Sequence, residues 1–305
     1  MLLLQQMIVL FFMMLLGYYV RKKEFITDIT CKQLSWLVVN VANPAMIISG
    51  SVNSESVIRG NELLRTLALA IMLFAVMIVL SRLLPLLLGV NRKDHGVYSV
   101  MLIFSNIGFM GFPLINAIYG GEALVYAAVF QIPFNVLIYT YGILALQSDP
   151  EKKEKMQFKK IVNIGTVCCA IAIVLSQSGI ETPTFIKSIS QNLSNLTAPL
   201  SMMVIGASMV SISFKELFSD VKLMIFCLVK LIVLPIAILF VLKGIISSEM
   251  LLGVCMVMIA TPVASMTAML AQQYEGNYPL AAKGVALSTI LSVITMPIVS
   301  MITGI

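Results

Sequence analysis

The chain has 305 residues, of which 59% are hydrophobic and only 11% charged, and its formal net charge is +6. Soluble domains contain about 45–50% apolar and about 25% charged residues, so this composition excludes an ordinary soluble protein and predicts an all-α integral membrane protein surrounded by lipid. Because the Lys and Arg residues form short clusters between apolar runs, the positive charge does not indicate a nucleic-acid-binding protein.

The apolar runs predict ten membrane-spanning helices. A spanning helix needs roughly 20 mostly apolar residues, and polar segments such as residues 21–24 and 149–155 separate the runs. The first and sixth runs are short, so eight or nine spans remain an alternative. The first run lacks a basic flank and a cleavage site, which favours a span over a signal peptide. The runs lie near residues 2–20, 30–51, 64–88, 95–119, 122–146, 161–178, 190–210, 221–242, 249–273 and 278–301.

The basic residues predict which side of the membrane each loop faces. Cytoplasmic loops carry an excess of Lys and Arg, and with ten crossings the excess collects on the cytoplasmic side only if both termini lie outside. The loops predicted to face outside then contain only Arg59, Arg65, Lys187 and Lys243. The sequence therefore predicts a multi-pass protein of the cytoplasmic membrane with both termini outside.

An internal repeat is predicted from breaks at matching positions. A shift of about 155 residues aligns Asn43-Pro44 with Ala198-Pro199, and Ser105-Asn106 with Thr261-Pro262. Five spans per half is an odd number, so the second half would enter the membrane in the opposite orientation. Inverted repeats are typical of secondary transporters, although Pro and Gly are common in membrane helices generally. The predicted units are a first five-helix repeat at 1–146, a charged cytoplasmic linker at 147–160 and a second five-helix repeat at 161–305.

Spans four and nine contain residues that weaken or break helices. Span four contains Gly108, Gly111 and Pro113, and span nine contains Pro262. Unwound backbone at membrane depth is tolerated only inside protein or beside a cavity, so we predict two broken helices that cross near the midplane. Simple proline kinks are the alternative. The helix N-termini at the breaks would carry partial positive charge and suit an anion.

On these residues the chain resembles the auxin efflux carrier family, which includes plant PIN-formed carriers and bacterial relatives. The resemblance covers nearly the whole chain, and the order and spacing of its motifs carry it rather than any one motif. The motifs are the run from Ser105 to Leu114 followed by Tyr119-Gly120, Thr261-Pro262 with Ala271, Tyr274 and the run into Ser288-Thr289, and Asn43-Pro44.

This resemblance implies a fold like those of bile-acid symporters and sodium/proton antiporters. Spans one, two, six and seven would form a scaffold, which could support a homodimer. The other six spans would form a mobile domain in which broken helices four and nine cross at the substrate. Such an arrangement implies elevator-type alternating access. Plant carriers have a long hydrophilic central loop, whereas the linker here is short, so regulation of the plant kind is not implied.

The resemblance also suggests substrate-binding residues. Asn106 at the first crossover and Gln131 in span five would contact the substrate, and Asn43 would face it from the scaffold. For Gln131 and Asn43, an ordinary hydrogen bond between helices explains the residue equally well. Thr261 and Ser265 are further candidates beside Pro262, which would shape the second crossover.

Lys230 is the outlier among the charged residues. It lies about nine residues into span eight, hence roughly 13 Å deep at about 1.5 Å per residue. A charge inside the membrane is a functional candidate by default, and Lys230 could neutralise helix C-terminal ends at the crossover or attract an anion. Snorkelling of the side chain toward the inner face is the alternative. No Asp or Glu lies well inside a predicted span, which argues against cation exchange.

Together these patterns predict a secondary transporter that moves a small organic anion, a carboxylate or auxin-like acid, by efflux or uniport. A ligand sensor or receptor built on a transporter fold is the alternative. An enzyme is disfavoured, because the sequence has one His and no HExxH or GxSxG motif. The five Cys residues form no CxxC pair, and we expect neither a metal nor a cofactor.

Overall fold

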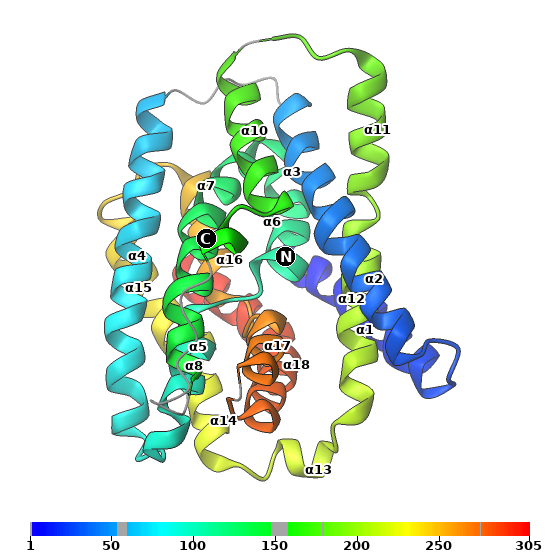
Figure 1. The fold of residues 1–305 in the computed structure, drawn as a ribbon. Coiled ribbons are helices and arrows are strands. Elements are labelled where there is room, and N and C mark those ends of the chain that lie inside the picture. Colours follow the sequence, from blue (N-terminus) through cyan, green and yellow to red (C-terminus); the bar gives the residue numbers. More distant parts are fainter. Residues whose placement is uncertain (1, 54–59, 148–157, 179, 275) are drawn as a thin grey trace.

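The computed structural model describes residues 2–53, 60–147, 158–178, 180–274 and 276–305, and their regular elements are helices (Figure 1). Of the predicted charged linker at 147–160, residues 148–157 lie outside the described residues. The predicted all-α class is confirmed. The order of apolar helices also agrees with a protein that crosses the membrane several times.

Six helical stretches in the described parts of the chain are long and apolar enough to cross a membrane. Three of them are continuous α-helices, and the other three contain a π-helical turn between two α-helical parts. The continuous ones are α1 (Leu2–Lys22), α4 (Gly60–Leu87) and α18 (Tyr278–Thr303). The others run from α2 (Asp28–Leu37) to α3 (Asn43–Val52), from α7 (Gly121–Leu137) to α8 (Ile143–Leu146), and from α14 (Val221–Leu228) to α15 (Leu234–Lys243).

The other four predicted spans correspond to shorter helices. Span four is α5 (His95–Ile103) and α6 (Phe112–Tyr119), and span nine is α16 (Glu249–Ala260) and α17 (Ser265–Gln273). The stretch predicted as spans six and seven holds α10 (Ile164–Ser178), α11 (Thr184–Ser194) and α12 (Thr197–Ser208). Two further short helices, α9 (Phe158–Ile161) and α13 (Phe214–Leu217), lie in connections.

Three of the four π turns among the described residues precede a proline, and the turn Ile138–Gly142 does not. Pro44, Pro113 and Pro235 each stand at the start of an α-helix that follows a π turn, and the residue four positions earlier lies within that turn. A proline ring clashes with the carbonyl four residues earlier and supplies no N–H. A widened turn removes that clash without ending the helix, and π turns occur often at functional sites.

Two groups of helices surround the broken ones. α1 packs closely on α12, and α3 packs on α10 and α11. On the other side α4 packs on α5 and α7, and α18 packs on α14 and α16. Figure 1 shows α4 along one side of the molecule, α11 and α12 along the opposite side, and α5, α6, α16 and α17 between them.

The α1–α12 contact is a close approach of two backbones. A Cβ atom added at Gly17 would lie 2.2 Å from the carbonyl oxygen of Met203, and one added at Gly206 would lie 1.8 Å from that of Met14. Small residues permit this kind of packing between membrane helices. The pair α1–α12 is therefore a firmly packed unit against which other helices can be positioned.

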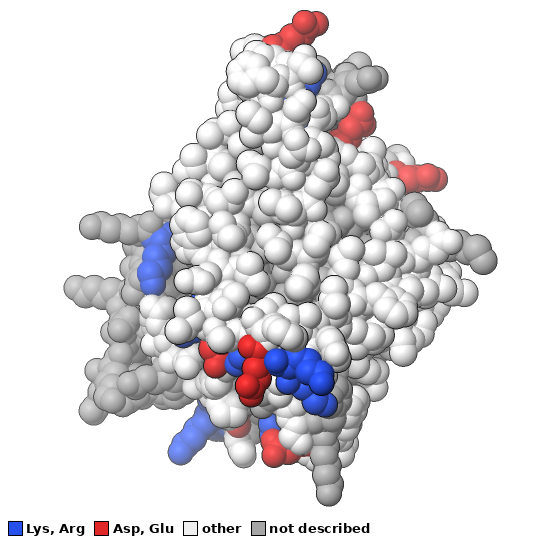
Figure 2. Space-filling model, turned by 90° about the vertical axis from the view of Figure 1, so that its right-hand side faces the viewer, with Lys and Arg blue, Asp and Glu red and all other residues white. Residues whose placement is uncertain are grey.

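The surface has the distribution of charge that a bilayer requires. Figure 2 shows a broad uncharged field with Lys, Arg, Asp and Glu gathered mainly toward the lower and upper parts of that face. Many large apolar side chains are exposed, among them Phe12 on α1 and Leu87 on α4. Lipid rather than water is the solvent that accommodates such a surface.

Candidate functional site

The two broken helices meet where their backbones are extended. Residues that follow α5 and α16 leave the helical conformation, and the two segments run antiparallel past one another. The N–H of Asn106 donates to the carbonyl of Pro262 at 2.7 Å, and the N–H of Ala264 donates to the carbonyl of Phe104 at 2.9 Å. Each broken helix thus satisfies backbone groups that the other leaves unpaired, which membrane-buried backbone requires.

Side chains add further links at this crossover. Asn106 Nδ2 donates to Ser265 Oγ at 3.2 Å, which ties the first broken helix to the start of α17. The N–H of Val263 donates to Ser288 Oγ at 3.0 Å, which ties the second segment to α18. The hydroxyl of Ser105 is also buried here. The predicted residues Asn106 and Ser265 are therefore in direct contact, although they come from opposite halves of the chain.

Two helix N-termini start at the crossover. One helical stretch runs from Ile107 to Tyr119 and the other is α17, which begins at Ser265. Neither start is capped by a side chain. Uncapped N–H groups give a helix N-terminus its partial positive charge, and they are donors suited to an anionic group.

Lys230 is turned into the crossover and is fully buried. It lies in the π turn Val229–Val233, and its Nζ donates to the carbonyl of Leu102 at 3.2 Å and to Ser105 Oγ at 3.0 Å. No carboxylate among the described residues forms an ion pair with it. The ammonium therefore lies at the carbonyl end of α5, where it offsets the partial negative charge of a helix C-terminus.

Asn43 lies against the first broken helix. Its side chain is buried, and a Cβ atom added at Gly108 would lie 3.4 Å from Asn43 Nδ2. Asn43 Oδ1 has no hydrogen-bond partner in the described part of the chain. The structure thus brings Asn43 of α3 next to the turn that follows Asn106, as expected of a residue facing the crossover.

Gln131 and Thr261 also have side-chain oxygens without a hydrogen-bond partner in the described structure. Gln131 on α7 donates from Nε2 to Asn135 Oδ1 at 2.9 Å rather than to a crossover residue. Gln131 Oε1 and Thr261 Oγ1 are both buried without a partner among the residues described. Each such atom loses the hydrogen bonds of water without replacing them, so each is a place where a bound molecule could restore a bond.

The second break lies at Pro262 as predicted, whereas the first lies at other residues than its glycines and proline suggest. Gly108, Gly111 and Pro113 lie in the helical stretch after the extended segment, and only Pro262 lies within an extended segment. Sequence reasoning also missed the hydrogen-bonding roles of Asn135 and Ser288. For Asn135 the signal was its spacing of four residues from Gln131 on a predicted helix, which places both side chains on one face.

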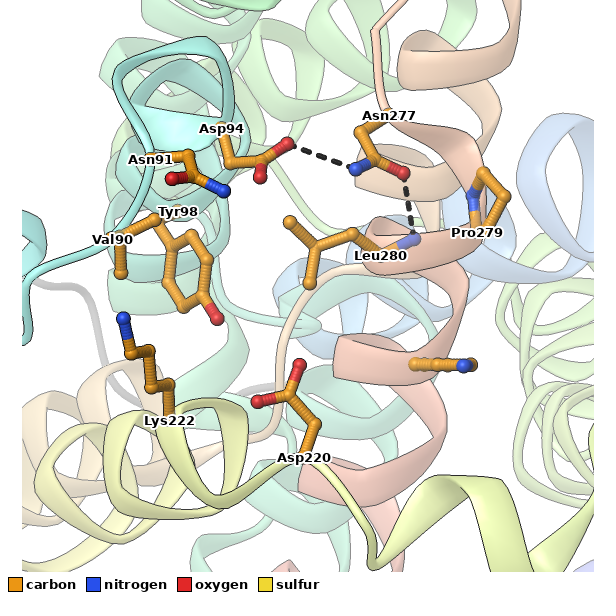
Figure 3. A pocket seen from close by; sticks show the side chains of 10 residues that line it. Val90, Asn91, Asp94, Tyr98, Asp220, Lys222, Asn277, Pro279 and Leu280 are labelled. Atoms are coloured by element: carbon orange, nitrogen blue, oxygen red, sulfur yellow. Dashed lines mark hydrogen bonds between the residues drawn. The ribbon is translucent and has the colours of Figure 1, made fainter.

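A separate cavity of about 330 Å³ lies at the other end of α5, at the starts of α5, α14 and α18 (Figure 3). Asn277 Nδ2 donates to Asp94 at 2.8 Å, and Asn277 Oδ1 caps α18 by accepting from the N–H of Leu280. Its lining carries charges of both signs, and it lies on loops that the topology prediction places inside. The lining residues are Val90, Asn91, Asp94, Tyr98, Asp220, Lys222, Asn277, Pro279, Leu280 and Lys283.

A much smaller hollow lies beside the crossover itself. It holds about 10 Å³, room for about one water molecule. Met7 and Met14 of α1 and Met202 of α12 face Met110 and Thr289 across it. The structure therefore has α1 and α12 closed against the helical turn that follows Asn106.

Comparison with known proteins covers nearly the whole chain. A family model described as "Membrane transport protein" matches residues 2–300. An uncharacterized transporter of Methanocaldococcus jannaschii is similar, with 26% identity over 294 residues that cover 92% of each chain. Both matches span the two crossover segments.

Proposed function

Since the chain belongs to the membrane transport protein family, the family of the auxin efflux carriers, we propose that it is a secondary transporter of a small organic anion. Family membership makes it a multi-pass membrane transporter, which agrees with the resemblance drawn from its motifs. The anionic substrate, the elevator motion and the direction of transport are our proposal. The substrate is a carboxylate or an auxin-like acid that leaves the cell by efflux or uniport.

The observation that carries the choice of an anion is the charge at the crossover. Two uncapped helix N-termini start there, and Lys230 brings a buried amino group that is hydrogen-bonded to Ser105. Among the described residues no group of His, Cys, Asp and Glu gathers to hold a metal ion. A site with donors and positive ends, and without carboxylates, favours an anion over an inorganic cation.

The resemblance suggests a division into a scaffold and a moving part. In this proposal α1, α2, α3, α10, α11 and α12 form the scaffold, and the broken helices move with α4, α7, α14 and α18. Because α7 packs on α3 and α10 as well as on α4, α7 lies at the boundary between the two parts. The chain crosses the membrane ten times in two inverted halves, and alternating access follows from movement of one part past the other. The inside-negative potential drives an anion outward with about 2.3 kcal/mol per charge per 100 mV.

The proposed binding residues lie on both sides of that division. Asn106 and Ser265 belong to the crossover, and Asn43 meets it from the scaffold at Gly108. Gln131 and Thr261 contribute oxygens that have no partner in the described structure. The closed hollow at Met110 corresponds to a state in which the scaffold covers the site.

Flux through proteoliposomes tests the proposal. Purified protein is first screened with organic acids for a rise in melting temperature, because a ligand that binds only the folded state stabilises it. Acids that bind are then loaded into vesicles, and a potassium diffusion potential is imposed. We expect flux that responds to the potential, and we expect Asn106→Ala to lower it by about tenfold or more, as loss of a substrate hydrogen bond does.

Asn116→Ala is the matched control, because Asn116 lies on the same helical stretch and is not part of the crossover. Equal flux through Asn106→Ala and the wild type would contradict the site. Binding without flux for every acid would assign the chain to the alternative class, a ligand sensor on a transporter fold.

A further inference from the structure

A chain of hydrogen bonds leads from Gln131 on α7 to the start of α10. Gln131 Nε2 donates to Asn135 Oδ1 at 2.9 Å, and Asn135 Nδ2 donates to Thr166 Oγ1 at 2.8 Å. The Thr166 hydroxyl donates in turn to the backbone carbonyl of Ile161 at 2.7 Å. The side chain of Asn135 is buried, and Gln131, Thr166 and Ile161 are partly buried, so the middle of this chain is shielded from solvent.

The carbonyl of Ile161, at the end of this chain, determines the direction of every hydrogen bond in it. A backbone carbonyl can only accept, so Thr166 gives its single hydroxyl proton to Ile161. Among the described residues, the other oxygen that this hydroxyl can reach is Asn163 Oδ1, at 3.4 Å. It is an acceptor as well, because Asn163 Nδ2 donates to the carbonyl of Lys160. Thr166 Oγ1 can therefore only accept from Asn135.

This direction determines how Gln131 is oriented. Asn135 directs its Nδ2 toward Thr166, so its Oδ1 faces Gln131. Because Asn135 Oδ1 is an acceptor, Gln131 donates to it from Nε2. The oxygen and nitrogen of a side-chain amide are otherwise assigned only from their neighbours, and here the Ile161 carbonyl decides the assignment. Gln131 Oε1 is left as the free end, buried and without a partner among the residues described.

We propose that Gln131 Oε1 is an acceptor for a donor group of the substrate, and that Asn135 and Thr166 are positioning residues that keep this oxygen in place. The transported anion then carries a hydroxyl or N–H group in addition to its carboxylate. This inference rests on the proposed function, because it takes Gln131 as a residue of the substrate site. It narrows the substrate from organic anions in general to organic anions with a hydrogen-bond donor.

Asn43 supplies a second buried side-chain oxygen. It lies on α3, which packs against α7, and its Oδ1 has no partner in the described structure. A free amide oxygen disfavours an analogue that lacks the matching donor, because the acceptor then stays unpaired.

Matched pairs of acids test this preference. Each pair differs in one donor: lactate against propionate, malate against succinate, and indole-3-acetate against naphthalene-1-acetate. Stabilisation of the purified protein and uptake into proteoliposomes are measured for both members. We expect the donor-bearing member of at least one pair to have a KM lower by about tenfold or more.

Three variants separate positioning from a general structural defect. Thr166→Val removes the acceptor for Asn135, so the Gln131 amide is free to reverse, and the preference between paired acids should disappear while turnover of the donor-free acid is retained. Thr166→Ser keeps the hydroxyl and should keep the preference. Gln131→Met removes the acceptor with little change in volume and should also equalise the pair.

Equal KM values within every pair for the wild type, or an undiminished preference in Thr166→Val and Gln131→Met, would overturn the inference. If no acid is transported, the proposed function fails separately, and the pairs are still decided by binding. Equal stabilisation by both members, or by neither, then counts against the donor requirement.

Discussion

Lys230 Nζ lies 3.0 Å from Ser105 Oγ, so the one lysine of the described residues that is fully buried is attached to the centre of the crossover. Ser105 belongs to the extended segment after α5, and Ser105 Oγ also lies 3.5 Å from the carbonyl of Ile259 on α16. The ammonium thus acts on the break in the first helix and, through one hydroxyl, on the helix that leads to the second break.

We expect Lys230→Met to lower transport strongly while the protein still folds. Methionine fills the space without the charge, so the carbonyl of Leu102 loses its donor. A cation at a helix C-terminus is worth up to about 2 kcal/mol, and a loss of this size at the moving crossover should lower uptake by about tenfold or more. Uptake into proteoliposomes and the size-exclusion profile measure the two effects.

The control is Lys243→Met, which removes an exposed lysine at the end of the same helical stretch and should leave uptake unchanged. If Lys230→Met transports as well as the wild type, Lys230 has no part in the mechanism.

Gly206→Ala should destabilise the α1–α12 unit. The added methyl would lie 1.8 Å from the carbonyl oxygen of Met14, so the two backbones must separate. Overpacking of this kind costs about 1–3 kcal/mol, and thermal melting in detergent should show a clearly lower midpoint. Gly60→Ala is the control, because the nearest atom of the described residues to its added methyl is 3.7 Å away. Equal midpoints for the two variants would show that α1 can shift freely on α12.

Pro235→Ala tests whether the π turn orients Lys230. Pro235 follows the turn Val229–Val233, and alanine allows an ordinary α-helical ladder there. A change from a π to an α turn would rotate the preceding residues about the helix axis, so Lys230 would no longer face Ser105. We expect uptake to fall while thermal stability is kept or rises, since alanine is the better helix former.

Pro297→Ala serves for comparison, because Pro297 lies inside α18 without a π turn. Uptake through Pro297→Ala should stay near the wild-type value. If Pro235→Ala also transports normally, the π turn does not determine the orientation of Lys230.

Gly108→Val should block transport more than it affects folding. A Cβ atom at this position would lie 3.4 Å from Asn43 Nδ2, which is ordinary contact, so the fold should accommodate Gly108→Ala. Valine adds two further methyl groups in the space between α3 and the crossover. Uptake should fall stepwise from Gly to Ala to Val, while the yield of monodisperse protein stays constant. A parallel fall in yield would instead indicate a packing defect.

Long apolar runs were predictable because length and composition alone determine whether a helix can span a bilayer. The position of the breaks was harder to predict. Pro113 was expected to interrupt span four, yet it follows a π turn and continues the helix. The residues that actually leave the helix, 104–106, contain neither Gly nor Pro. They are extended because they pair with a segment from the other half of the chain, and such a partner cannot be seen in a local window.

The residues of the candidate site could be predicted from the sequence, but their contacts could not. Asn106 and Ser265 could be named from motifs, but their contact depends on the antiparallel pairing of the two segments. Gln131 was predictable as a polar residue in an apolar span. The orientation of its amide depends on Thr166, which lies 31 residues after Asn135, and on the Ile161 carbonyl to which Thr166 donates.

The pairing of the crossover segments also has a consequence for biogenesis. The contact between Asn106 and Ser265 joins residues 159 positions apart. At a synthesis rate of about 5–20 residues per second, the partner of the first segment emerges about 8–30 seconds later. During that interval the N–H of Asn106 and the carbonyl of Phe104 lack their final partners. A nascent first half should therefore stay next to the insertion machinery or a chaperone, and a chain truncated before Pro262 should be degraded rather than accumulate in the membrane.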